Sequence, residues 1–227
     1  TGDVLGNKTA KGVELGVKGI LMDNTLSYTL SAYRVQQENE VTDNPEWLEA
    51  DGETRPTLPR YVPGGSTRGE GLSLDLSGRL GRNLTLLGNI AWTDVWVHEN
   101  KGNPALVGTK PLGGQNGPTR SAAIAARYDV RSGAFKGVRF GLTYQHYTRY
   151  LRYAATNATA SSLPTTTFYL PEKNEVSAMI GYSHRPRKKV TVNYTLNVMN
   201  LFDEEEITVA AYAPTGREAR FSVGLSF

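Results

Sequence analysis

A short segment in the second half of the chain brings arginine and tyrosine side chains close together in the sequence. Its members are Tyr147, Arg149, Tyr150, Arg152 and Tyr153. Guanidinium groups are planar, permanently charged donors that stack on aromatic rings and pair with anions in a fixed geometry. Alternating arginines and tyrosines therefore suit an anionic or aromatic ligand. We predict that these five residues bind a small-molecule chelate.

The rest of the sequence offers little catalytic chemistry. His98, His146 and His184 lie far apart, and none has metal-ligand spacing to a carboxylate pair. The glycine-rich segment 64–69 lacks the Gly-Lys-Ser/Thr ending of a phosphate loop, and we find no serine elbow. The sequence has no cysteine, which excludes disulfides and thiolate metal ligands. We expect a protein that is not an enzyme and that has no cofactor and no metal site.

Composition argues against a nucleic-acid-binding protein and against a helical membrane protein. The net charge of +3 is small and its basic residues are scattered, so nothing indicates a nucleic-acid partner. Hydrophobic residues make up 39% of the chain, mean hydropathy is −0.40, and no apolar run approaches the ~20 residues of a membrane-spanning helix. A β-barrel remains possible, because only alternate residues of its strands contact lipid.

The elements that position the arginine–tyrosine segment are predicted to be strands, because apolar and polar residues alternate through most of the chain. The predicted strands are 11–22, 25–36, 67–80, 84–98, 119–130, 138–147, 172–183, 190–202 and 220–227. Short turns within hairpins alternate with long connections at 37–66, 99–118 and 148–171. Outer-membrane barrels show this sorting, with short periplasmic turns and long extracellular loops. The predicted fold is all-β: an antiparallel transmembrane β-barrel meander with eight or nine strands in this chain.

The closing strand has two clearly different faces. Phe221, Val223, Leu225 and Phe227 point one way, and small polar residues point the other. A strand between lipid and a wet lumen has this composition.

Together with two further motifs, this strand resembles a known family. The motifs are Asn200-Leu201-Phe202-Asp203 and the loop Pro214-Thr-Gly216-Arg217. The combination resembles the C-terminus of TonB-dependent outer-membrane receptors. The resemblance implies that residues 1–227 are the C-terminal segment of a 22-stranded barrel in the bacterial outer membrane, with the plug domain absent from this chain. It also implies that the closing strand is the signal for the outer-membrane assembly machinery.

The function implied by the resemblance is active uptake of a large scarce solute such as a ferric siderophore or cobalamin. The TonB complex would drive it through the missing plug. The remaining implied partners are outer-membrane lipid and lipopolysaccharide, and the latter offers another role for the arginines near residue 150. Two alternatives stay open. One is a free-standing eight-stranded barrel with a structural or adhesion role, and the other is a soluble carbohydrate-binding β-sandwich.

Overall fold

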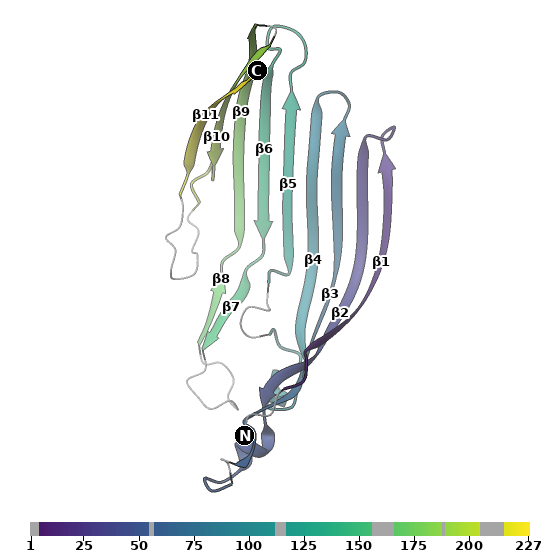
Figure 1. Ribbon diagram of the computed structural model, residues 1–227, viewed down its shortest axis with the longest axis vertical. Coiled ribbons are helices and arrows are strands. Elements are labelled where there is room, and N and C mark those ends of the chain that lie inside the picture. The colour runs from purple at the N-terminus through teal and green to yellow at the C-terminus, as the bar shows by residue number, and fades with distance from the viewer. Residues whose placement is uncertain (1–4, 55–56, 112–116, 156–165, 188, 205–215) are drawn as a thin grey trace.

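The computed structural model is dominated by one antiparallel sheet (Figure 1). It describes residues 5–54, 57–111, 117–155, 166–187, 189–204 and 216–227, with the side chains of 152–155 and 166–168 left out. The sheet has nine strands in the order β1-β2-β3-β4-β5-β6-β9-β10-β11, and β7 and β8 form a separate hairpin. No helix in these ranges is long and apolar enough to span a bilayer.

The strands follow one another as a meander, which confirms the predicted topology. Their bounds are β1 Thr9–Leu21, β2 Leu26–Asp43, β3 Tyr61–Leu80, β4 Leu84–Asn100, β5 Arg120–Asp129, β6 Val138–Tyr147, β7 Tyr150–Ala155, β8 Thr166–Leu170, β9 Lys173–Arg187, β10 Val190–Met199 and β11 Glu218–Ser226. Figure 1 shows short turns at its upper end and the longer connections at its lower end. Strands of the main sheet run from 9 to 20 residues, long enough for a bilayer crossing.

Three segments predicted as loops contain regular structure, and to that extent those predictions were wrong. β2 and β3 extend as a paired ribbon beyond the rest of the sheet, joined through α1 (Pro45–Glu49). The register shifts on either side of Glu40, where the bulge residue Asn39 takes a φ of 61°. The ribbon could not be predicted from apolar–polar alternation, because neither of its faces needs to be apolar. The other two loops hold the short helix η2 (Pro104–Leu106) and the β7–β8 hairpin.

Register separates the side chains of the sheet into an apolar face and a polar face. Leu30, Leu74 and Ile90 are direct cross-strand partners on the apolar face, and Ser31, Ser73 and Ala91 occupy the next row on the polar face. The large apolar side chains remain exposed, as with Leu142 at 52% and Val223 at 53%. No second layer of the described residues covers them. A two-layer sandwich would bury such residues, so the structure contradicts that alternative.

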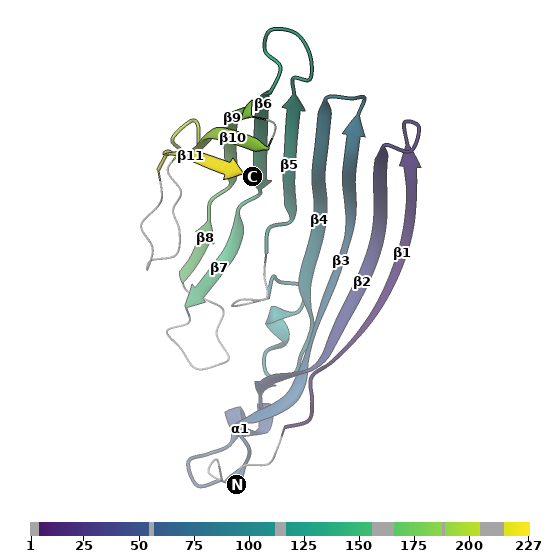
Figure 2. The same ribbon diagram turned by 45° about the horizontal axis from the view of Figure 1, so that its top comes forward.

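Aromatic residues on the apolar face lie near both ends of the strands. Tyr28, Phe140, Tyr182 and Tyr194 lie near the short turns, and Trp92, Trp96 and Tyr144 lie near the long connections. Two such belts are the arrangement expected at the two interfaces of a bilayer. Figure 2 shows that the sheet curls, with β10 and β11 turned relative to β1–β5.

Candidate functional site on the polar face

The predicted arginine–tyrosine segment lies where β6 ends and β7 begins. Tyr147 is the last residue of β6 and opposes Ser121 and Lys173, which places it on the polar face. Its ring meets that of Tyr150 edge-on, with ring centroids 5.9 Å apart. The Arg149 guanidinium lies 4.9 Å from the centroid of the Tyr169 ring. The structure therefore brings Tyr147, Arg149 and Tyr150 together and adds Tyr169, which the sequence analysis missed.

The β7–β8 hairpin holds this cluster in place. Leu151 and Leu170 are each 8% exposed, which makes them two of the four buried apolar side chains among the described residues. Tyr150 pairs with Leu170, and Leu151 pairs with Tyr169. The side chains of Arg152 and Tyr153 lie outside the described part of the chain, so their predicted role stays a prediction. Arg149 and Tyr169 are exposed and could stack on a planar or anionic ligand.

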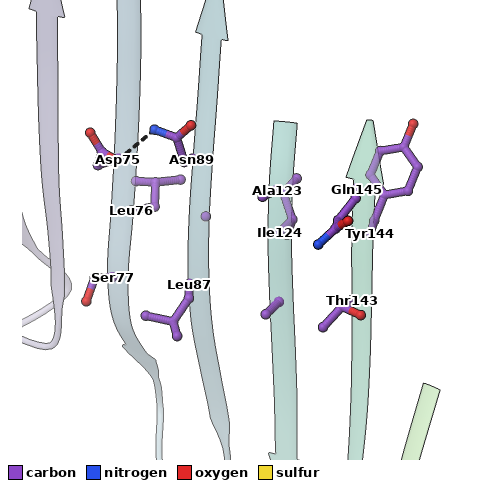
Figure 3. Close-up of a pocket in the computed structure, with 12 residues that line it drawn as sticks. Asp75, Leu76, Ser77, Leu87, Asn89, Ala123, Ile124, Thr143, Tyr144 and Gln145 are labelled. Carbon is purple, nitrogen blue, oxygen red and sulfur yellow. Dashed lines mark hydrogen bonds between the residues drawn. The ribbon is translucent and has the colours of Figure 1, made fainter. Parts of the chain in front are cut away.

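Between this cluster and the short turns, the polar face is hollowed. A cavity of about 400 Å³ lies over β3, β4, β5 and β6. In Figure 3 the side chains of Asp75 and Asn89 approach one another, and Asn89 Nδ2 donates a 2.7 Å hydrogen bond to Asp75 Oδ1. Thr143 and Gln145 line the same cavity from β6. These four side chains offer hydrogen-bonding groups, and Leu87, Ala123 and Ala125 form an apolar part of the same lining.

A second hollow of about 590 Å³ continues along the polar face over β4, β5, β6, β9 and β10. Arg127 and Glu175 line it together with the apolar side chains of Leu87 and Met179. Next to it, Arg139 extends across Gly181 and donates to Ser183 Oγ at 3.3 Å and Thr195 Oγ1 at 3.2 Å. The polar face is thus built from side chains that bridge neighbouring strands.

A third cavity, of about 510 Å³, lies on the same face near the long connections. Glu40 lies at its wall, where Thr67 Oγ1 donates to its Oε2 at 2.6 Å and Lys8 Nζ lies 2.7 Å from its Oε1. Both carboxylate oxygens are therefore occupied by groups of the chain itself. This arrangement holds the extended β2–β3 ribbon against the segment before β1.

Another arginine–aromatic cluster lies at the far end of this ribbon. The Arg60 guanidinium is 5.0 Å from the Trp47 ring and 5.2 Å from the Tyr61 ring. The sequence did not predict this grouping, because Trp47 lies within α1 and a loop separates that helix from Arg60 and Tyr61. Its distance from the polar face makes it less suitable than the Arg149 cluster as part of a lumenal path.

The Asn200-Leu201-Phe202-Asp203 motif forms the connection between β10 and β11. Asn200 is 4% exposed; its side chain accepts from the Glu204 amide at 2.9 Å and donates to the Glu204 carbonyl at 2.8 Å. Asn200 and Asp203 have φ values of 48° and 59°, a region that asparagine and aspartate tolerate better than most residues. Phe202 is 67% exposed, and the Leu201 amide donates to the Val176 carbonyl at 2.7 Å. The motif therefore fixes the conformation of the chain after β10 through hydrogen bonds to the Glu204 and Val176 backbone.

The closing strand β11 pairs with β10 along its whole length. Phe221, Val223 and Leu225 lie on the apolar face and are 64%, 53% and 59% exposed, and Phe227 is 93% exposed. Nothing in this geometry tests their predicted role in membrane assembly. For the residues whose placement is described, no three His, Asp or Glu side chains are grouped closely enough to hold a metal ion.

Comparisons with known proteins agree with this architecture. The family model for the TonB dependent receptor-like β-barrel matches residues 3–201. The metal-pseudopaline receptor CntO of Pseudomonas aeruginosa is 30% identical over 196 residues, which cover 85% of this chain and 23% of that protein. The chain thus spans about a quarter of the length of this relative.

Solved structures share the fold at lower identity. FpvA of P. aeruginosa bound to a heterologous pyoverdine has a TM-score of 0.75 at 18% identity, covering 98% of this chain and 28% of that one. The ferric-catecholate import receptor Fiu of Escherichia coli K12 has a TM-score of 0.69 at 19% identity, with 98% and 28% covered. Since the family model matches most of its length, the chain belongs to the TonB-dependent receptors of the bacterial outer membrane, and it forms part of their β-barrel.

Proposed function

We propose that this chain is the C-terminal part of the barrel wall of a receptor that takes up a metal chelate of the siderophore type. The observation that carries the proposal is the position of Arg149, Tyr147 and Tyr150 at the loop end of a polar, hollowed face. A chelate arriving from outside would meet this cluster first and the hydrogen-bonding wall next. The relative named as a metal-pseudopaline receptor and the neighbour bound to pyoverdine support this substrate class.

This chain would form part of the barrel wall and of the outer rim of the transport path. Other parts of the receptor would control the passage of the chelate. Energy would come from the TonB complex, acting through the plug domain of the receptor. Arg149 is suited to hold the anionic groups of a chelate, because it is exposed and its guanidinium is already oriented against the Tyr169 ring. Family members transport ligands rather than transform them, so we propose no catalytic step.

The test uses the full-length receptor that contains this chain, with Arg149→Ala and Arg149→Lys as variants. The probes are ferric pyoverdine and metal-loaded pseudopaline, and the measurements are equilibrium binding and uptake into cells. A cation–π contact of about 0.5–2 kcal/mol predicts that Arg149→Ala weakens binding of the accepted chelate roughly 2- to 30-fold. Arg149→Lys should recover only part of this loss, because lysine lacks the planar fork.

Arg82→Ala is the matched control, since Arg82 lies in the short turn between β3 and β4 at the opposite end of the sheet. It should bind and transport as the unmodified receptor does. If both variants of Arg149 bind every accepted chelate with unchanged affinity, the cluster is not a ligand site. If neither metal-loaded probe binds the unmodified receptor, the substrate class is wrong.

A further inference from the structure

Two neighbouring hairpins carry a group of cations at the end of the sheet with the short turns, which is the upper end in Figure 1. One hairpin is β5–β6, which turns through residues 130–137, and the other is β9–β10, which turns through residues 184–189. The exposed cations of these two segments are Arg131, Lys136, Arg185, Arg187 and Lys189. The described residues of the segments include no aspartate or glutamate, and none of the five cations forms an ion pair with a described residue. The two turns therefore carry a concentrated and unbalanced positive charge.

A cavity of about 740 Å³ lies between these turns. Its lining includes Lys136 and Arg185 and, from the polar face, Ser183, Thr191 and Asn193. Ser183 Oγ donates to Asn193 Oδ1 at 2.6 Å, so the amide nitrogen of Asn193 remains free to donate. The Thr191 hydroxyl has no hydrogen-bond partner within the described part of the chain. The cavity thus offers cations and free donors, which match a carboxylate because that group only accepts hydrogen bonds.

The guanidinium of Arg139 adds to the positive charge around this cavity. Its Nη1 donates to Ser183 Oγ at 3.3 Å, which places it beside the lining. The cross-strand partner of Arg139 is Asp129, and Asp129 Oδ2 accepts from Arg127 Nη2 at 3.2 Å. This carboxylate is therefore engaged by a different arginine, and the cavity keeps its positive charge.

A large apolar side chain accompanies the cations. Phe135 lies in the same turn as Lys136 and is 73% exposed. The turn holds its conformation through a 3.0 Å hydrogen bond from the Val138 amide to the Phe135 carbonyl. Aromatic and arginine side chains are enriched in protein–protein interfaces. A small anion such as phosphate would contact the cations and leave the phenyl ring in water, whereas a peptide can contact both.

The spread of the cations also suits a peptide. From β5 to β10 there are three strand intervals, which amount to about 14 Å at a spacing of about 4.8 Å. An extended chain rises about 3.3 Å per residue, so a segment of about five residues reaches across both turns. A phospholipid is a poorer match, because Ser183, Thr191 and Asn193 line the cavity from the side of the sheet that faces away from lipid.

We propose that the β5–β6 and β9–β10 turns bind an acidic, extended segment of a separate periplasmic protein, with one carboxylate held in the cavity between Lys136 and Arg185. The short turns of outer-membrane barrels face the periplasm, where such a partner can reach them. The inference rests on membership of the receptor family and is independent of the transported solute.

The experiment uses the full-length receptor that contains this chain, purified in an uncharged detergent. The probe is a peptide of about five residues with glutamate at its first, middle and last positions, glycine between them and an uncharged fluorescent label. Fluorescence anisotropy measures its affinity. The same peptide with glutamine in place of glutamate is the reference.

The test variant removes three cations of the two turns, as Lys136→Gln/Arg185→Gln/Arg187→Gln. The matched control removes the same charge near the long connections, at the opposite end of the sheet. It is Lys11→Gln/Arg34→Gln/Arg120→Gln.

We expect the glutamate peptide to bind the unmodified receptor and the glutamine peptide not to bind. Because each exposed ion pair contributes modestly and three cations are removed, the test variant should bind the glutamate peptide roughly 3- to 150-fold more weakly. The control should bind it as the unmodified receptor does. Equal binding by the test variant and the control would overturn the proposal. So would the absence of glutamate-peptide binding to the unmodified receptor.

Competition distinguishes the peptide from other anions. Millimolar inorganic phosphate, short-chain phosphatidylglycerol and ferric pyoverdine are each added to the peptide complex, and we expect none of them to displace the peptide. Displacement by phosphate would assign the cavity to a small anion, and displacement by the lipid would assign it to the membrane. Displacement by ferric pyoverdine would place it in the transport path. Each of these three results would overturn the proposal.

Two further measurements separate this proposal from folding and from transport. Heat-modifiable gel mobility establishes that the test variant is a folded barrel; if it is not, Lys136→Glu alters a single exposed turn residue and should weaken peptide binding in the same direction. Chelate binding by the test variant should match that of the unmodified receptor, because Arg149 follows the opposite end of β6. A loss of chelate binding with unchanged peptide binding would contradict the proposal and leave the transport function standing.

Discussion

The carboxylate of Asp203 accepts a 2.6 Å hydrogen bond from the backbone amide of Arg217, across the connection between β10 and β11. The Arg217 side chain returns the contact, with Nη2 3.7 Å from Asp203 Oδ2 and Nη1 3.5 Å from the Leu201 carbonyl. The two residues belong to separate sequence motifs, and the structure joins them into one closure. This closure lies directly beside the Met199–Glu218 pair, where β11 begins to pair with β10.

Removing this closure should destabilise the end of the barrel. Asp203→Ala deletes the acceptor of an exposed charge-assisted hydrogen bond, so we expect a loss of about 1 kcal/mol in the free energy of unfolding. The measurement is reversible urea unfolding of the full-length receptor in lipid vesicles. Glu204→Ala is the control, because only backbone atoms of Glu204 contact Asn200. Equal stability of the two variants would show that the Asp203–Arg217 contact does not stabilise this end of the barrel.

The close contact between Tyr33 and Gly71 can be tested by substituting the glycine. The Tyr33 ring covers Gly71 on the polar face, and its hydroxyl lies 2.7 Å from Thr93 Oγ1 on β4. A Cβ at position 71 would lie 2.6 Å from the Tyr33 Oη and even closer to the Trp92 carbonyl oxygen. Gly71→Ala should therefore cost about 1–3 kcal/mol of stability.

Gly88 is the matched position for this experiment. A Cβ there would come no closer than 3.8 Å to another side chain. Gly88→Ala should be neutral or stabilising by up to about 1 kcal/mol, because alanine has less backbone freedom to lose. Thermal unfolding of both variants, followed by heat-modifiable gel mobility, compares them directly. A destabilised Gly88→Ala protein together with an unaffected Gly71→Ala protein would contradict the packing described for this sheet.

The two faces of β6 can be tested at adjacent residues. Leu142 lies on the apolar face and is 52% exposed, and Thr143 lies on the polar face. An arginine on the lipid side costs about 2–4 kcal/mol near the bilayer midplane, whereas lumenal substitutions are tolerated. Leu142→Arg should therefore lower the yield of folded receptor in the membrane, and Thr143→Arg should not. If Thr143→Arg lowered the yield and Leu142→Arg did not, the assignment of the lipid-facing and lumenal faces of β6 would be wrong.

The C-terminal residue carries the predicted assembly signal. If Phe227 is recognised by the assembly machinery, Phe227→Ala should reduce the amount of receptor in the outer membrane and increase unassembled receptor in the periplasm. Ser226→Ala, on the opposite face of the strand end, should assemble normally. Cell fractionation followed by immunoblotting measures both pools. Normal assembly of Phe227→Ala would remove this residue from the signal.

Period-two alternation was sufficient to predict the main sheet, because one side of each strand must be apolar. Thus Phe221, Val223 and Leu225 were placed correctly on one face from sequence alone. The extended β2–β3 ribbon could not be predicted in this way, since residues 38–43 and 61–66 show no regular alternation of apolar and polar residues. Tyr169 was missed for a different reason: it reaches Arg149 only through a hairpin whose two strands are far apart in the sequence.

The end of the apolar face does not follow a single cross-strand row. On β2, β3 and β4 the first charged residues beyond the apolar ones are Arg34, Glu70 and Asp94, which are direct cross-strand partners. On β5 the corresponding residue is Arg120, which opposes Trp92 and so lies two residues nearer the short turns. Further steps of two residues follow at His146 on β6 and at Asn200 after β10. From Lys11 on β1 to Asn200 at the end of β10 the displacement is eight residues over seven strand intervals. With a rise of about 3.3 Å per residue and a spacing of about 4.8 Å, a flat headgroup plane meets the strands only if they lean by about 40° from the membrane normal.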